Sequence, residues 1–187
     1  MESKSLSLSS REIRELKESD FDSKFCEIYV DLTLTPSGYH WIFPEGENTV
    51  NAGLGIAMIK GFPSPKNQFY KKILPKSLFR DSSLIEGGSW CVPTRRPLDC
   101  MTGNGIVVVG DSACQVNPIH GGGIGPSMMG GSLAGKVIAE SIENDDVSRE
   151  RLWRYNVDYM KVHGATHAGL DIFRLFLLKS VSNEDIN

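Results

Sequence analysis

The feature that most constrains this fold is a glycine-rich loop set between a β-branched run and a helix. Residues 106–109 read Ile-Val-Val-Val, a composition typical of a strand buried on both faces. Gly110 and Asp111 follow, and a glycine-rich stretch then leads into a helix predicted over 126–142. Pro126 suits the first helical position. The sequence therefore predicts a strand–loop–helix unit.

This unit has the features of a ligand site. A helix N-terminus offers unpaired N–H groups and partial positive charge, which suit an anion or an electron-rich carbonyl. Asp111 stands just after the strand, where α/β sheets bind their ligands. Gly131, Gly135 and Ala139 recur along the helix and predict a small-residue face that permits close approach of a neighbouring backbone. We expect a small anionic or polar ligand at the loop; the alternative is a turn that only packs the helix onto a sheet.

The chain before this unit has the pattern of an antiparallel meander. Apolar side chains alternate with polar ones over 26–34, which predicts a half-buried strand. Two more strands are expected over 39–43 and 49–59, with turn residues between them. A further strand is predicted over 83–92.

Helices are expected on both sides of the glycine-rich loop. A short helix should begin at Ser64 and Pro65, which suit an N-cap and a first helical position. After the loop, two helices are expected over 149–162 and 165–181. Gly164 lies between them and is predicted to be a C-terminal cap.

Together these elements predict a mixed fold, α+β with an α/β part: an antiparallel sheet, part of an α/β domain and C-terminal helices. The N-terminus is serine-rich and then charged; Ser9 and Glu12 have the spacing of a capping box, but few apolar residues follow. The predicted divisions are a mobile segment over 1–20, the antiparallel domain over 21–95, the α/β part over 96–145 and a helical tail over 146–187.

Composition excludes several classes of function. The net charge of −3 over 187 residues gives no broad electrostatic reason to expect nucleic acid. No run approaches the roughly 20 apolar residues of a membrane-spanning helix. The N-terminus lacks an apolar signal core, so a cytoplasmic location is expected. The four cysteines have no zinc-like spacing, and we expect free, buried or idle thiols.

Isolated histidines give weaker signals. His163 and His167 could share a helical face with Asp171, but Gly164 interrupts the helix and no glutamate supplies a base, so no metal is expected. His120 lies inside the glycine-rich loop. It either faces a ligand there, where it could donate a proton, or has a simple place on the loop surface.

Two further segments leave alternatives open. Arg95 and Arg96 either meet a phosphate of a lipid or cofactor or lie at the surface, which is the commoner case near a proline-rich turn. Residues 170–178 are strongly apolar. They rest either against a membrane surface or lipid, or against another domain.

The segment 110–131 (GDSACQVNPIHGGGIGPSMMGG) resembles the second flavin-binding motif of the p-hydroxybenzoate-hydroxylase-like flavoproteins and is most similar to the geranylgeranyl reductase branch. The resemblance implies that the aspartate hydrogen-bonds ribityl or pyrophosphate-side hydroxyls of FAD. It also implies that backbone amides of the loop reach the N1/O2 edge of the isoalloxazine, where a helix N-terminus would stabilise the reduced anion. The cofactor-binding residues so implied are Gly110, Asp111, Pro118, Gly121, Gly122, Gly123 and Ile124.

A second match points to the same branch. Residues 39–44 (Tyr-His-Trp-Ile-Phe-Pro) are similar to that family's aromatic motif, and residues 51–55 (Asn-Ala-Gly-Leu-Gly) to the strand that follows it. In the family this region lines the cavity for the isoprenoid chain. The residues agree, since three aromatics share one strand face and two glycines leave gaps on the next strand; plain core packing is the alternative. The substrate-binding residues so implied are Tyr39, Trp41, Phe43, Pro44, Gly53 and Gly55; no catalytic residue is identified.

The resemblance covers residues 25–145 and implies an antiparallel substrate domain with a partial FAD-binding α/β domain. The implied activity is FAD-dependent reduction of C=C bonds in a geranylgeranyl lipid chain, as the C-terminal portion of an enzyme. The family's βαβ unit with its GxGxxG fingerprint is not in this sequence. We therefore expect a fragment or one half of a split protein, inactive alone and needing a nucleotide-binding half to retain FAD.

An electron donor, so far unidentified, and peripheral membrane contact are expected as well. Two alternatives remain at this point. One is another flavoprotein of the same fold: a hydroxylase, a halogenase or a quinone-linked electron-transfer dehydrogenase. The other is a non-catalytic module that binds a lipid or a partner chain.

Overall fold

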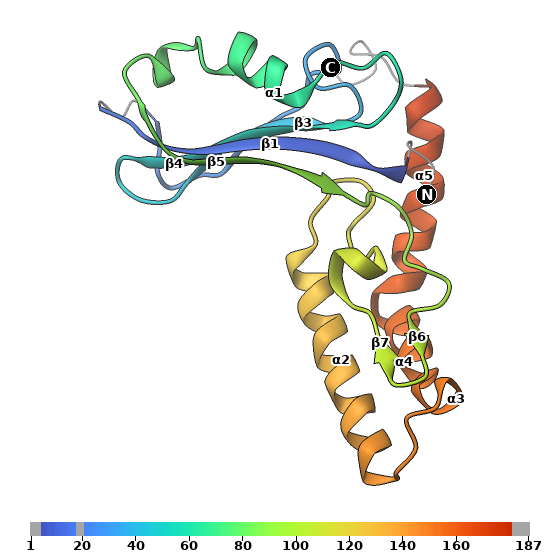
Figure 1. The fold of residues 1–187 in the computed structure, drawn as a ribbon. Coiled ribbons are helices and arrows are strands. Elements are labelled where there is room, and N and C mark those ends of the chain that lie inside the picture. Colours follow the sequence, from blue (N-terminus) through green and yellow to red (C-terminus); the bar gives the residue numbers. More distant parts are fainter. Residues whose placement is uncertain (1–4, 18–20, 181–187) are drawn as a thin grey trace. The chain divides into compact units, whose positions relative to one another are not determined.

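The computed structural model describes residues 5–17 and 21–180. The chain forms two compact units, one ending at Val92 and the other beginning at Pro93 (Figure 1). The sequence placed this division three residues later, at 95. The predicted division at 145 is not seen, because the helices that follow pack on the helix of the α/β part and share its core.

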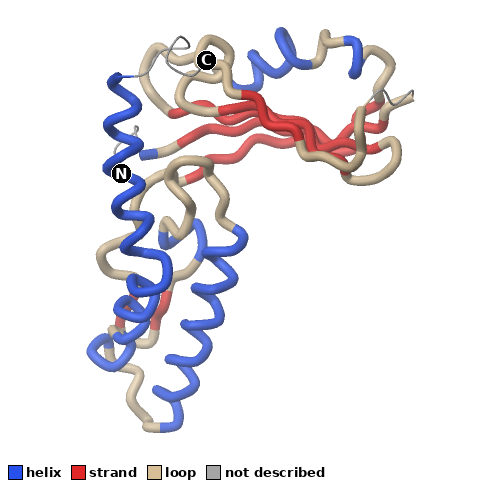
Figure 2. Tube along the Cα trace, turned by 180° about the vertical axis from the view of Figure 1, so that it is seen from behind, coloured by secondary structure: helices blue, strands red, loops and turns tan. Residues whose placement is uncertain are grey.

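The first unit is built on a five-stranded antiparallel sheet with the strand order β2-β3-β4-β1-β5. The sheet is drawn in red in Figure 2. Its strands are β1 (Ser7–Glu15), β2 (Glu27–Tyr29), β3 (Tyr39–Pro44), β4 (Thr49–Ala57) and β5 (Ser83–Val92). The strands predicted over 39–43, 49–59 and 83–92 are confirmed.

The prediction of a mobile segment over 1–20 is wrong for its described part. Ser7–Glu15 forms β1, which lies between β4 and β5 and pairs with both along its length. Ser9 and Glu12, expected to cap a helix, are strand residues, and Glu12 is buried. The polar composition of this segment did not predict a strand. The buried carboxylate of Glu12 is tolerated in β1 because it accepts a hydrogen bond from Tyr70 at 2.6 Å and forms an ion pair with Arg14. Residues 18–20 lie outside the described chain.

The strand predicted over 26–34 is much shorter than expected. Only Glu27–Tyr29 pairs, as the edge strand β2, and the chain then turns over 32–34. Ile28 is 59% exposed and Val30 is 54% exposed, so the alternating apolar residues do not form a buried face. An edge strand has one neighbour, and its side chains lack the cover that a central strand receives.

Register assigns the two faces of this sheet. The even-numbered side chains of β4 (Val50, Ala52, Leu54 and Ile56) are all buried. They pack with Phe69, Ile73 and Phe79 from the segment that crosses this face. That segment comprises α1 (Pro65–Gln68), a π-helical turn over Phe69–Ile73 and a 3-10 turn over Ser77–Phe79. The helix predicted from Ser64 and Pro65 is thereby confirmed, with Ser64 at the N-cap and Pro65 in the first turn.

His40 is a buried polar residue on this covered face. Its ring stacks on Tyr29, with centroids 4.6 Å apart, and its Nε2 atom lies 3.3 Å from the ammonium of Lys76. Burial, together with the positive charge of Lys76, lowers the pKa of His40 to about 4. A neutral imidazole can accept a hydrogen bond from the ammonium, which makes this arrangement stable at neutral pH.

The second unit contains a two-stranded antiparallel sheet of β6 (Thr102–Gly103) and β7 (Ile106–Val107). The strand predicted over 106–109 as buried on both faces is wrong in this structure. Only two of its residues pair, and Ile106 is 62% exposed. The segment has the composition of a central parallel strand, but no strand of the described chain pairs with it in parallel.

Helices make up the rest of the second unit. The helix predicted over 126–142 is confirmed as α2 (Ile124–Glu143), which starts two residues earlier than expected. It packs with α3 (Arg149–Leu152) and α4 (Arg154–Tyr159) around a core that includes Tyr155 and Tyr159.

Gly164 is not the C-terminal cap that was predicted. The chain stays helical through a π-helical turn over Met160–Gly164 and continues as α5 (Ala165–Ser180). A side chain at Gly164 would lie 2.2 Å from the sulfur of Met160. The glycine therefore makes room for Met160 within one continuous helical run.

Replacing His40 with phenylalanine should remove part of the pH dependence of stability. The unfolded imidazole takes up a proton near pH 6.5, whereas the folded one does so only near 4. The free energy of unfolding should therefore fall as the pH drops through this window, by up to about 3 kcal/mol. His40→Phe keeps the stacked ring and should lack this component. Urea unfolding at about pH 7 and about pH 5 measures it, and an equal decrease in both proteins would contradict it.

Candidate functional site

The face of the first sheet opposite to α1 carries the predicted aromatic residues. Tyr39, Trp41 and Phe43 point to the same side of β3, with successive ring centroids 5.8 and 6.1 Å apart. Tyr39 lies opposite Gly55, and Trp41 lies opposite Gly53. The register thus brings the three aromatics and the two glycines together on one face. We name this group the aromatic face.

The ring of Trp41 lies directly on the neighbouring strand. A β-carbon at Gly53 would be 2.5 Å from the Trp41 ring and 2.7 Å from the carbonyl oxygen of Ser10. The indole Nε1 donates a hydrogen bond of 3.1 Å to Asn51, whose amide donates in turn to Glu45 at 2.9 Å. Gly53 and Asn51 therefore fix the position and the orientation of the indole ring.

Pro44 does not belong to the aromatic face. It lies opposite Val50, and alternation along the strand points its ring to the covered side of the sheet. Its contribution is to end β3, where Glu45 N–H donates to the carbonyl of Thr49 at 2.8 Å and closes the hairpin.

The strands β1 and β5 supply half of this face, and the sequence did not predict their contribution. Ser9 pairs with Gly55 on one side and with Trp90 on the other, so Tyr39, Gly55, Ser9 and Trp90 form one row across four strands. Trp90 is 70% exposed, and the Ser9 hydroxyl donates to its carbonyl at 3.2 Å. Two aromatic side chains therefore flank a row of small residues. The only signal for it in the sequence is Trp90 itself, because the polar composition of its partner strand β1 does not predict a strand.

Arg11 brings a positive charge to the same face. It lies between Gly53 and Gly88 in the next row and forms an ion pair of 2.7 Å with Glu86. Apart from this ion pair, the side chains of these rows are aromatic, small or apolar. The face is therefore suited to a long apolar ligand.

The glycine-rich loop of the second unit opens with a 3-10 turn over Gly110–Ala113. Gly110 has a φ of +68°, and Cys114 closes the turn in the left-handed region. This turn exposes Asp111 beside the N-terminus of α2: a β-carbon at Gly123 would lie 3.4 Å from the Asp111 Oδ1 atom. The carboxylate and the start of the helix are thus brought together, as the sequence predicted.

Gln115 holds this loop from inside and was not identified from the sequence. It is fully buried; its Oε1 atom accepts from the Gly110 N–H at 2.8 Å, and its Nε2 atom donates to the Tyr155 hydroxyl. A β-carbon at Gly130 would be only 2.3 Å from this Oε1 atom. The amide can therefore lie flat against α2 because residue 130 has no side chain.

The second part of the loop forms a compact turn around Asn117. Its Oδ1 atom accepts from the Ile119 N–H at 2.9 Å, and its carbonyl accepts from Gly121 at 2.9 Å. The amide of Gly122 donates to His120 Nδ1 at 3.1 Å. Of the predicted cofactor residues, Gly121 and Gly122 therefore use their amides within the loop, and Pro118 has no N–H to offer.

Further N–H groups come from the start of α2. Gly123 is the N-cap, and Ile124 and Gly125 follow in the first turn, where N–H groups lack partners within the helix. Together with the exposed Asp111 carboxylate, they form a donor–acceptor set on one small surface. Such a set can hold an electron-rich carbonyl and a hydroxyl of the same ligand.

The remaining candidate residues have local roles. Arg96 pairs with Asp99 at 3.0 Å, and Arg95 donates to the Arg96 carbonyl. Asp171 pairs with Arg174 at 2.8 Å beside the buried His167, whose pKa is lowered by burial and by the neighbouring histidines. Across residues 5–17 and 21–180, no group of three or more His, Cys, Asp or Glu side chains is placed to hold a metal ion.

The four cysteines differ in their exposure. All four are free thiols. Cys114 is buried, whereas Cys26 and Cys91 are exposed.

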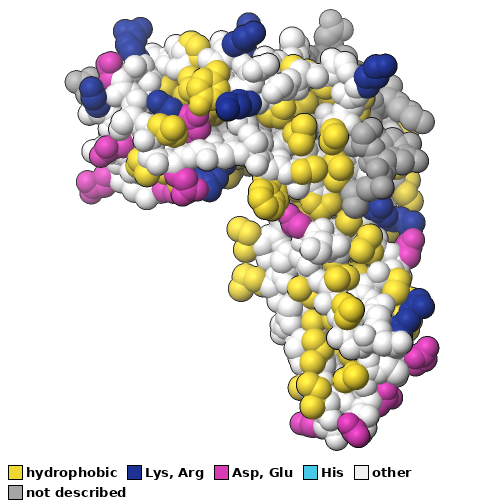
Figure 3. All heavy atoms as spheres, viewed as in Figure 1, with side chains coloured by type: hydrophobic (Ala, Val, Ile, Leu, Met, Phe, Trp, Pro, Cys, Tyr) yellow, Lys and Arg dark blue, Asp and Glu magenta, His cyan; other side chains and the backbone are white. Residues whose placement is uncertain are grey.

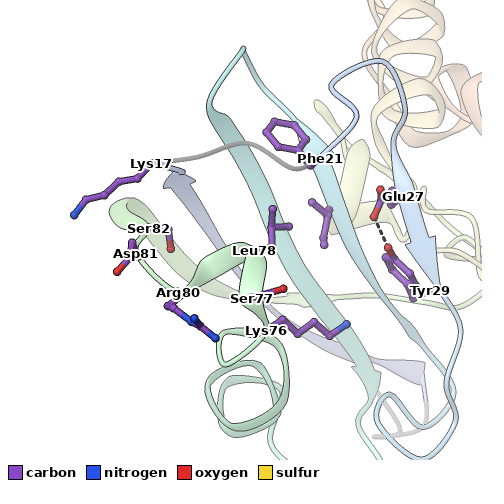
Figure 4. Close-up of a pocket in the computed structure, with 11 residues that line it drawn as sticks. Lys17, Phe21, Glu27, Tyr29, Lys76, Ser77, Leu78, Arg80, Asp81 and Ser82 are labelled. Atoms are coloured by element: carbon purple, nitrogen blue, oxygen red, sulfur yellow. Dashed lines mark hydrogen bonds between the residues drawn. The ribbon is translucent and has the colours of Figure 1, made fainter.

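A cavity of about 600 Å³ lies on the covered side of the first sheet, shown in Figure 4. Lys76 extends toward Tyr29 within it, and Tyr29 donates a hydrogen bond to Glu27. Lys17, Arg80 and Asp81 also line it. Charges of both signs in its wall make it a poor match for a prenyl chain, and none of the six predicted substrate residues lines it.

Solved structures first define the fold class. A geranylgeranyl bacteriochlorophyll reductase-like protein from Thermoplasma acidophilum has a TM-score of 0.87 and 24% identity, covering 100% of this chain and 47% of that one. A flavin-dependent halogenase has a TM-score of 0.63 and 15% identity, covering 98% and 37%. Identities this low establish the fold alone, which is the mixed α/β fold these flavoproteins share.

Sequence relatives then identify the family. Residues 9–89 match the model of the geranylgeranyl reductase catalytic domain. A digeranylgeranylglycerophospholipid reductase of Sulfolobus acidocaldarius is 44% identical over 100% of this chain and 41% of its own length. Digeranylgeranylglycerophospholipid reductase 2 of Methanopyrus kandleri is 35% identical over 90% of this chain and 43% of its own length. The chain thus belongs to the geranylgeranyl reductase family and spans less than half the length of these relatives.

A pair of glycine substitutions tests how the loop is held. Gly130→Ala should force the buried Gln115 amide away from α2 and reduce the free energy of unfolding by about 1–3 kcal/mol. Gly131→Ala is the matched control, because a β-carbon there meets nothing within 4 Å. It should be neutral or stabilising by up to about 1 kcal/mol, from helix propensity. Chemical denaturation measures both; equal effects would show that Gln115 is not held against Gly130.

Proposed function

We propose that this chain forms the lipid-binding face and the flavin-facing loop of an FAD-dependent reductase that saturates C=C bonds in geranylgeranyl chains of a membrane lipid. The aromatic face carries the proposal. Its register places Tyr39, Trp41, Gly53 and Gly55 together, as the family resemblance requires of a prenyl-binding surface. The names of the relatives support a glycerophospholipid with two such chains as the substrate class.

The glycine-rich loop fits one end of a flavin. Asp111 is exposed and can accept a hydrogen bond from a ribityl hydroxyl, and the Ile124 and Gly125 amides can donate to the N1/O2 edge. Gly123 leaves open a position that a side chain would partly fill beside Asp111. The residues present thus fit the isoalloxazine and ribityl part of FAD. We propose that the adenylate part is held by the portion of the flavoprotein fold that lies outside the region matched by this chain.

When bound and reduced, a flavin supplies a hydride for addition to an alkene carbon. The contribution of this chain is to orient the substrate and to stabilise charge. Trp41 and its neighbours hold an apolar chain by contact area, without hydrogen bonds that would fix one register. A surface of this kind lets a lipid slide, so that successive double bonds can be presented. The partial positive charge at the start of α2 favours an anionic ring edge.

The whole enzyme is also proposed to contact a membrane and an electron donor. On α5, Ile172, Phe173 and Phe176 are exposed, while Asp171 and Arg174 are buried on the other side. An apolar exposed helix face suits the surface of a bilayer that contains the lipid substrate. Within the described residues, no helix is long and apolar enough to cross that bilayer.

Removing one indole should impair the lipid reaction and leave the flavin in place. The test protein is this chain joined behind the portion of the Sulfolobus relative that precedes the matched region, chemically reduced and given a digeranylgeranyl lipid. Trp41→Ala should lower double-bond reduction by at least about tenfold, because burial of one large apolar side chain contributes about 1.5–3 kcal/mol. Trp90→Ala should lower it too.

Tyr70→Phe is the control, since Tyr70 lies on the covered side of the sheet and contacts Glu12. Mass spectrometry of the lipid measures reduction, and absorbance measures bound flavin. Full turnover in both tryptophan variants would remove the aromatic face from the substrate site. Oxygen-dependent hydroxylation or halogenation of an aromatic substrate would instead assign the site to another flavoprotein activity.

The proposed role of Asp111 is tested separately. Asp111→Asn in the joined protein should weaken flavin binding by about tenfold, because a charge-assisted hydrogen bond to a hydroxyl is lost. Asp145→Asn is the matched control: Asp145 lies just after α2 with a φ of 50°, a conformation that asparagine accepts. Flavin fluorescence titration measures both. Equal affinities would show that the Asp111 carboxylate does not contact the cofactor.

A further inference from the structure

The segment that covers one face of the first sheet carries an unbalanced positive charge. Residues 48–80 contain six Lys or Arg and no Asp or Glu, in a chain whose net charge is −3. All six are exposed, and within residues 5–17 and 21–180 none of them forms an ion pair with a carboxylate. Figure 3 shows Lys and Arg side chains along the part of the first unit where Figure 1 places α1. We name this set the basic surface: Lys60, Lys66, Lys71, Lys72, Lys76 and Arg80.

The packing of this segment on the sheet turns its lysines outward. Pro65, Phe69 and Ile73 recur every four residues and are buried, so they form the side of the helical turns that faces the sheet. The three lysines between them are exposed. Like charges held on one surface repel one another, and no ion pair offsets that repulsion in the described part of the chain. The arrangement is therefore suited to an anionic partner.

Apolar side chains project from the same segment at a tight turn. The Ile59 carbonyl accepts a hydrogen bond of 3.0 Å from the Phe62 N–H, and Gly61 has a φ of +95°, as a type II turn requires of its third residue. Lys60 therefore stands at the tip of the turn. Met58 is 40% exposed and Phe62 is 37% exposed. The turn thus presents a cation between two apolar side chains.

The kind of cation favours a lipid surface over a protein. Five of the six side chains are lysines, and lysine is depleted in protein–protein interfaces, where arginine is enriched. A lysine ammonium is a point charge on a flexible stem, which suits mobile headgroups that offer no fixed geometry. Lysines interspersed with exposed apolar side chains are typical of segments that lie in the interface of a membrane. The proposed substrate, a glycerophospholipid, carries a phosphate and is a component of such a surface.

We propose that the basic surface binds the anionic headgroups of the bilayer that contains the lipid substrate, with Phe62 entering the interface. This inference rests on the proposed function and deepens it. The contact proposed for α5 is apolar and belongs to the second unit, whereas this contact is electrostatic and belongs to the first. Each lysine close to an anionic bilayer strengthens binding by about fivefold. Salt weakens such binding because the charges are exposed to solvent.

Sedimentation with lipid vesicles tests the basic surface without flavin or turnover. The chain is mixed with vesicles of phosphatidylcholine, which is neutral overall, or of phosphatidylcholine with phosphatidylglycerol, which is anionic. Lys71→Gln combined with Lys72→Gln removes two charges from the basic surface. Lys24→Gln combined with Lys136→Gln is the matched control, because these lysines are also exposed and lie outside the segment.

The unchanged chain should bind the anionic vesicles at least about tenfold more tightly than the neutral ones, and added salt should reduce the difference. The variant at 71 and 72 should bind anionic vesicles at least about tenfold more weakly, and the control should stay within about twofold of the unchanged chain. Equal binding of the variant and the unchanged chain would overturn the proposal and leave an acidic protein as the partner of these lysines. Equal binding to both kinds of vesicle would also overturn it, because apolar contact would then be sufficient.

The turn at Phe62 gives a second readout. Phe62→Ser should weaken binding to anionic vesicles by about fivefold at every salt concentration, because an apolar contact is not screened. An unchanged affinity would contradict the entry of this side chain into the interface.

The joined protein separates this inference from the proposed function. With the substrate in anionic vesicles, the variant at 71 and 72 should reduce double bonds at least about tenfold more slowly than the unchanged protein. With the substrate in a neutral detergent, both should react at the same rate. Equal slowing in vesicles and in detergent would overturn the proposal, because the lysines would then act at the reaction site. Vesicle binding without any double-bond reduction would contradict the proposed function and leave the basic surface standing.

Discussion

The aromatic face of the first sheet depends on the absence of a side chain at Gly53. With no β-carbon there, the Trp41 indole lies flat against the neighbouring strand, and Asn51 orients it through its Nε1 atom. Any larger residue at 53 would collide with the ring and with the Ser10 carbonyl at once. Tyr39 and Phe43 continue the same surface. Gly55, opposite Tyr39, has no side chain that would rise above the sheet beside it. The aromatic face therefore depends on glycine spacing in β4 as much as on the aromatics of β3.

In the second unit a glycine likewise makes room for a side chain, which here is polar and not aromatic. The amide of Gln115 is buried against Gly130 and satisfies both Gly110 and Tyr155. A buried amide without partners would cost more than it contributes, so this satisfied network favours one loop conformation. Asp111 is held at the start of α2 as a result. In both candidate sites a side chain thus lies against the backbone at a position where only glycine leaves room for it.

The sequence predicted the grouping of the candidate site residues better than it predicted the elements that surround them. The aromatic spacing at 39–43 and the glycines at 53 and 55 specified one face, and the pairing of β3 with β4 confirmed it. β1 was missed because its polar residues hide a central strand whose partners are far away in sequence, at 83–92. Trp90 was missed with it.

Local sequence patterns also gave wrong predictions where neighbouring strands or side chains determine the structure. The apolar alternation at 26–34 described a half-buried strand, but an edge position leaves Ile28 exposed. Gly164 resembled a helix end, yet a neighbouring methionine required it inside a continuous helix. Gln115 carries no signal in the sequence, since its importance comes from the hydrogen bonds it makes. These are properties of tertiary contacts, which no local spacing records.

The most direct measurement is a crystal structure of the joined flavoprotein with a bound digeranylgeranyl lipid. We predict a prenyl chain across Tyr39, Trp41 and Gly55, with the flavin N1/O2 edge at the Ile124 amide. A lipid bound instead in the cavity beside Lys76, or an isoalloxazine remote from Asp111, would contradict it.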